Sequence, residues 1–183
     1  PEALAATLRA ASLLRKIPSN EKALAGYLAV LKSIPQDEDY RNRWLTKEEL
    51  QKEIVDTWGD WIKQEAFAEA IALSPAMSSV FDNVTAIEYS ALAHQKWAEH
   101  LQAEHDNAPP QDRGVLVPEL RQRWRLSGRQ FEKLAQALRT SSRYTEAIRK
   151  SAEQFRRGHD YEMSLKQWQE FIDADPAVGM SHA

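Results

Sequence analysis

The sequence predicts an all-α protein, and three observations support this fold class. Glycine and proline are scarce, with 6 and 8 in 183 residues. Long stretches are rich in Ala, Leu, Glu, Gln, Lys and Arg, which lose little side-chain freedom in a helix. β-branched residues cluster only in the run from Gly114 to Val117, which is too short to build a sheet. We therefore expect a multi-helix bundle.

The first two predicted helices form an antiparallel hairpin. One begins at about Glu2 and ends at Pro18, and Ser19 can cap the next, which continues to Pro35. The segment LRKIP that ends at Pro18 is followed seventeen residues later by the similar segment LKSIP. Solenoid proteins repeat in this way, but such arrays need about three units to bury a continuous face. We therefore favour the explanation that two helices of equal length end in similar sequences.

A capping box marks the next helix. After a polar loop at about 36–44, Thr46 and Glu49 have the spacing at which each side chain bonds the other's backbone amide. The apolar pattern then continues to about Leu73, which predicts one long core helix. Gly59 lies inside it at a cost of about 1 kcal/mol relative to Ala, so we expect a close helix crossing there.

Charge is segregated along the chain. Residues 112–158 hold 12 Lys and Arg against 5 Asp and Glu, whereas residues 1–111 hold 11 against 17. The change of sign coincides with a Pro-rich loop predicted at 107–116. We therefore divide the chain into an acidic helical bundle at 1–106, the loop, a basic region with a C-terminal amphipathic helix at 117–174, and a tail at 175–183.

Two helices are expected in the later part of this region. Ser141 or Ser142 can cap the first, which ends near Gly158. The second runs from about Asp160 to Asp173, with apolar residues at intervals of four, three and four: Tyr161, Leu165, Trp168 and Ile172. The apolar face of such a helix has to pack against another apolar surface.

Nothing in the sequence predicts an enzyme, a cofactor or a metal site. Cysteine is absent, the six glycines are too dispersed for a phosphate-binding loop, and no Gly-x-Ser-x-Gly elbow is present. His100 and Glu104 are one turn apart, but two ligands on one helix do not define a metal site. No apolar run approaches the ~20 residues needed to cross a bilayer. We expect no membrane association and a cytoplasmic location.

The stretch from Leu120 to Leu134, LRQRWRLSGRQFEKL, resembles the helix-turn-helix of bacterial and phage DNA-binding proteins. Its apolar residues are spaced as in that motif, Ser127 lies where the second helix is usually capped, and Arg121 and Arg125 depart from the pattern. The resemblance covers about residues 117–139 and implies a basic, helix-turn-helix-like C-terminal subdomain. It also implies that residues at the start of the second helix read bases in the major groove: Arg129, Gln130 and Lys133. A competing resemblance is to the helical lid of AAA+ ATPases, without their nucleotide-binding core.

A basic stripe follows this motif. Its members are separated by four, seven and seven residues, and two further arginines flank it: Arg139, Arg143, Lys150 and Arg157, with Arg149 and Arg156 beside them. Such a stripe can bind phosphates by displacing counterions.

We therefore expect a non-enzymatic nucleic-acid-binding protein that binds duplex DNA within a larger assembly, as a regulator or a phage or mobile-element accessory. Such an assembly implies a protein partner or a homo-oligomer. The alternative is a helical protein–protein adaptor whose basic stripe docks on an acidic partner.

Overall fold

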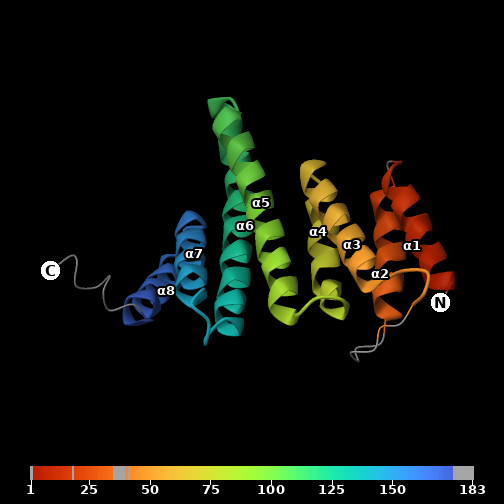
Figure 1. Ribbon diagram of the computed structural model, residues 1–183. Helices are drawn as coiled ribbons and strands as arrows, with labels where there is room; N and C mark the ends of the chain where they lie inside the picture. Colours follow the sequence, from red (N-terminus) through yellow and green to blue (C-terminus); the bar gives the residue numbers. More distant parts are fainter. Residues whose placement is uncertain (1, 18, 35–39, 41, 175–183) are drawn as a thin grey trace. The chain divides into compact units, whose positions relative to one another are not determined.

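The computed structural model describes residues 2–17, 19–34, 40 and 42–174 (Figure 1). These residues form eight α-helices and one 3-10 helix, and they contain no strand, so the all-α prediction is confirmed. No helix of the described ranges is long and apolar enough to cross a membrane. The chain divides into two compact units between Ser90 and Ala91, within the helix α5 (Asn83–Asn107).

Unit 1 begins with the predicted helical hairpin, α1 (Glu2–Arg15) and α2 (Asn20–Lys32). The two helices pack closely at Gly26, where an added Cβ atom would lie only 2.8 Å from the Cβ of Ala11. Tyr27 and Leu31 of α2 are fully buried in the core of the unit. The absence of a side chain at Gly26 therefore sets how near α1 and α2 can approach.

The long helix predicted up to Leu73 is wrong, because the chain turns in the middle of it. Thr46 and Glu49 form the predicted capping box at the start of α3 (Lys47–Lys63). Glu65 then adopts a left-handed conformation with φ of 62°, and α4 (Phe67–Leu73) follows. The prediction for Gly59 is also wrong, since a Cβ there would meet nothing within 4 Å.

The rest of unit 1 consists of the 3-10 helix η1 (Ser74–Ser79) and the first turns of α5. Asp82 caps α5, because its carboxylate accepts hydrogen bonds from the amide and the hydroxyl of Thr85, each at 2.8 Å. The hydrogen bond from the Thr85 amide is the largest of the effects that hold the pKa of Asp82 below its usual value. This cap fixes where α5 begins.

Unit 2 contains the later part of α5, followed by α6 (Pro110–Ala137), α7 (Tyr144–Arg157) and α8 (Tyr161–Ala174). The Pro-rich loop predicted at 107–116 is wrong from Pro110 onward, because α6 starts there. Proline is well suited to the first turn of a helix, where its missing N–H has no helical partner to lose. The connection after α5 is therefore only Ala108 and Pro109.

The predicted inward face of α7 is confirmed at Ile148 and Phe155, which are fully buried. The predicted serine cap is not formed, because Arg143 occupies the capping position and its side chain makes no capping hydrogen bond. In α8 the buried residues are Ser164 and Gln167, rather than the apolar residues of the helix. The predicted tail at 175–183 lies outside the described residues.

Candidate functional site

The predicted helix-turn-helix has no turn, since Ser127 and Gly128 lie inside the continuous helix α6 and are buried. An added Cβ at Gly128 would lie 3.0 Å from the ring of Phe155, and the hydroxyl of Ser151 donates to the Gly128 carbonyl at 3.0 Å. The Ser-Gly pair therefore allows α7 to pack closely on α6. The sequence signal was real, but its cause is a helix crossing and not a turn.

The three predicted base-reading residues consequently lie in the middle of α6. Arg129 and Lys133 are exposed, and Gln130 is half-buried. None of them lies at a helix N-terminus, the position from which a recognition helix contacts base edges. Their predicted place at the start of a second helix is wrong. The exposed side chains of Arg129 and Lys133 still form part of a basic surface.

Of the two residues that depart from the motif, Arg125 holds the end of α7. Arg125 donates from Nε to the carbonyl of Gly158 at 2.8 Å, directly after the last turn of α7. A Cβ at Gly158 would lie 3.0 Å from the carbonyl oxygen of Arg121. A cation at the C-terminal end of a helix is also favoured by the helix dipole. Arg125 is thus committed to packing, whereas the side chain of Arg121 is exposed.

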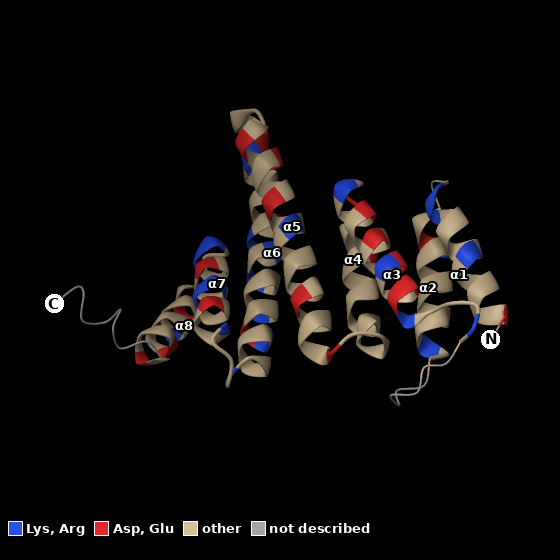
Figure 2. Cartoon of the chain, viewed as in Figure 1, with Lys and Arg blue, Asp and Glu red and all other residues tan. Residues whose placement is uncertain are grey.

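Several cations of the predicted stripe are engaged within α7 and α6. Lys150 pairs with Glu146 at 3.1 Å, and Arg149 pairs with Glu153. The guanidinium of Arg157 lies 4.7 Å from the ring centroid of the buried Trp124. Figure 2 shows the resulting alternation of blue and red along α7.

Arg139 lies apart from the α7 stripe. It lines a cavity of about 260 Å³ together with Tyr144 of α7 and Lys166 of α8. The hydroxyl of Tyr144 donates to Glu170 at 2.6 Å, and this bond raises the pKa of the tyrosine. Arg143 precedes α7 and is exposed, as is Arg156 in its last turn. The structure therefore distributes the predicted site over more than one surface of unit 2.

No family model, curated protein or solved structure matches the chain. We therefore infer a function from the chemistry of the side chains.

A buried histidine lies in unit 2. His94 of α5 is 8% exposed, and its Nδ1 has no hydrogen-bond partner among the described residues. Burial lowers its pKa to about 4, and the positive charges of Arg123 and Lys133 act in the same direction. The described residues contain no group of three or more side chains that could hold a metal ion. His94 is therefore a neutral core residue at pH 7.

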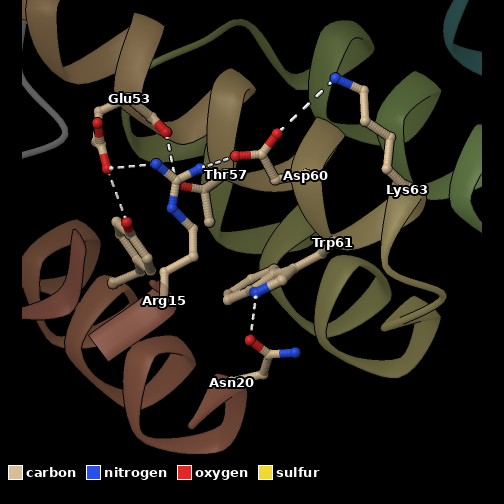
Figure 3. A network of polar contacts seen from close by, with 8 residues as sticks. Arg15, Asn20, Glu53, Thr57, Asp60, Trp61 and Lys63 are labelled. Atoms are coloured by element: carbon tan, nitrogen blue, oxygen red, sulfur yellow. Dashed lines mark hydrogen bonds and ion pairs between the residues drawn. The ribbon is translucent and has the colours of Figure 1, made fainter. Parts of the chain in front are cut away.

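Unit 1 contains a network of polar contacts that sequence reasoning missed (Figure 3). Arg15 of α1 donates to Asp60 at 2.6 Å and lies 3.6 Å from Glu53, both on α3. Glu53 also accepts from the hydroxyl of Tyr27 at 2.8 Å. Burial is the main reason that the pKa of Tyr27 is raised to about 12. The partners lie far apart in the sequence, and the network connects α1 and α2 to α3.

Proposed function

We propose that the protein is a non-enzymatic nucleic-acid-binding module that contacts the phosphates of duplex DNA through the basic surface of α6 and α7. The observation that carries the proposal is the excess of positive charge in residues 112–158, which contain 12 Lys and Arg but only 5 Asp and Glu. Four of those five acidic side chains already have basic partners, at distances of up to 4.0 Å: Glu119, Glu132, Glu146 and Glu153. Most acidic side chains of this region therefore already have a basic partner, and the positive charges still outnumber them.

Several exposed cations of this region have no ion pair with an acidic side chain of the described residues, and they include the following five: Arg121, Arg129, Lys133, Arg139 and Arg156. Arg121, Arg129 and Lys133 fall on multiples of four residues along α6, so they follow one another along its surface. Guanidinium and ammonium groups bind phosphate oxygens and release counterions, which gives affinity without reading sequence. We infer salt-sensitive binding with no groove-inserted helix.

The test is the affinity for a fluorescent DNA duplex, measured by anisotropy over a range of salt concentrations. Removing Arg129 and Lys133 together, as Arg129→Ala with Lys133→Ala, should lower the slope of log affinity against log salt by about 2. The matched control is Lys22→Ala with Lys32→Ala, which removes the same charge from exposed positions of α2. That control should keep the full slope.

Lack of any binding at low salt would overturn the proposal. If the protein bound poly-L-glutamate and no DNA, the result would instead favour an adaptor that docks on an acidic protein. Equal loss of binding in both double variants would show that only net charge matters and that α6 is not the contact surface.

A further inference from the structure

The helix α8 buries polar residues and exposes apolar ones. Ser164 donates to the carbonyl of Ala152 at 2.9 Å, and Gln167 donates to Glu132 at 3.2 Å, so both buried side chains are hydrogen-bonded. On the other side of the helix, Leu165 is 70% exposed and Tyr161 is 56% exposed. Ile172 continues this apolar face at the spacing of two helical turns from Leu165. A contiguous exposed apolar face of this kind marks an interaction site.

A second exposed apolar face lies on α1. Leu13 is 64% exposed, and Ile17 is exposed in the turn that follows the end of α1 at Arg15. Ala6 and Ala10 are also exposed, and they lie two turns and one turn before Leu13 on α1. Small residues beside Leu13 allow another helix to approach closely. The face on α1 therefore has the shape and chemistry to receive a helix that carries larger apolar side chains.

We propose that the apolar face of α8 binds the apolar face of α1 of a second copy of this chain, in a head-to-tail contact. The exposed charges beside the two faces have opposite net sign, since Glu162, Lys166 and Asp173 give −1 beside the face on α8, whereas Glu2, Arg9 and Lys16 give +1 beside the face on α1. Two α8 helices packed antiparallel would instead bring together two edges of negative net charge. Charge complementarity thus selects α1 as the partner.

A contact between two different faces lets each copy bind one neighbour at each face, so the copies form either a closed ring, of which a reciprocal dimer is the smallest, or an open chain. One helix from each copy gives an interface at the small end of the range for specific complexes, and such contacts are weak. The association should therefore depend on concentration. It does not depend on nucleic-acid binding and can be tested without DNA.

The experiment is sedimentation equilibrium of the full chain at increasing concentration. Leu165→Glu blocks the face on α8, and Leu13→Glu blocks the face on α1, so each variant alone should associate at least about tenfold more weakly than the wild type. An equimolar mixture should regain association and stop at a 1:1 complex, because each variant contributes the one face that the other lacks. Circular dichroism checks that both variants stay folded.

Val115→Glu is the matched control, because Val115 is 80% exposed and lies on α6, outside both faces. It should associate as the wild type does. A wild type that stays monomeric at the highest concentration would overturn the proposal. So would a mixture of the two blocked variants that does not associate. Wild-type association of Leu13→Glu alone would also overturn it and would point to α8 binding to α8.

Discussion

The hydroxyl of Ser151 donates a hydrogen bond to the carbonyl oxygen of Gly128, and the 3.0 Å contact joins α7 to the interior of α6. That carbonyl already lies in a helix, so the hydroxyl adds a second interaction to it. The ring of Phe155 covers the same glycine, at 3.0 Å from the position of a Cβ atom. Hydroxyl, ring and glycine together fix the closest approach of the two helices.

This close approach predicts opposite effects for the same substitution at two glycines of α6. Gly114→Ala should raise the free energy of unfolding of unit 2 by about 0.5–1 kcal/mol, because alanine favours the helix and a Cβ there meets nothing within 4 Å. Gly128→Ala should lower it by about 1 kcal/mol, because overpacking against Phe155 exceeds that gain. Hydrogen exchange of the α7 amides measures both. Equal gains would show that the crossing has room for a methyl group.

The sequence predicted most helices correctly because apolar periodicity and capping are local properties. The Ser127-Gly128 pair shows the limit of local reasoning, since small residues suit a tight turn and a close helix crossing equally well. The deciding partners, Ser151 and Phe155, lie more than twenty residues further along the chain. By contrast, the pairing of Arg149 with Glu153 could have been expected from their spacing of four residues on one helix.

The contacts of Arg15 could not be predicted in this way, because Glu53 and Asp60 lie more than thirty residues further along the chain. They give a second prediction, for unit 1. Arg15→Met should lower the free energy of unfolding by about 1–3 kcal/mol, because it keeps the buried stem but leaves Glu53 and Asp60 without their shared cation. Urea denaturation followed by circular dichroism measures the change.

Arg9→Met provides the comparison for that experiment, since Arg9 is exposed on the same helix. A surface substitution of this kind should change the free energy of unfolding by no more than about 0.5 kcal/mol. Equal effects of Arg15→Met and Arg9→Met would mean that the network contributes nothing beyond surface charge.

The buried ring of His94 predicts a pH-dependent stability of unit 2. Its pKa is about 4 in the folded protein, below the ordinary value of 6.5, so the unfolded chain binds the proton more readily. Stability is therefore full above pH 6.5, falls as the pH decreases toward 4, and changes no further below that. Arg123 and Lys133 add to the cost of charging the ring.

His94→Leu should remove this part of the pH dependence. Between pH 6.5 and 4 the free energy of unfolding of the wild type should fall by roughly 1–3 kcal/mol more than that of the variant. This range allows for solvent screening of the charge on the ring. Parallel denaturation curves at both pH values give the difference, and NMR titration of the His94 ring gives its protonation directly. A ring that titrates near pH 6.5 would contradict the prediction.

The continuous course of α6 through Arg129 predicts how that residue contributes to DNA binding. A side chain at the N-terminus of a recognition helix would discriminate one base pair, so its loss would weaken binding mainly to duplexes that carry that base pair. Arg129 lies in mid-helix, where its guanidinium can reach phosphates. Arg129→Ala should therefore weaken binding by the same factor for every duplex and lower the salt slope by about 1. Affinities for a set of duplexes of different sequence, measured at one salt concentration, test this. A loss of ~1–3 kcal/mol confined to one base pair would restore base reading by Arg129 despite the absence of a turn.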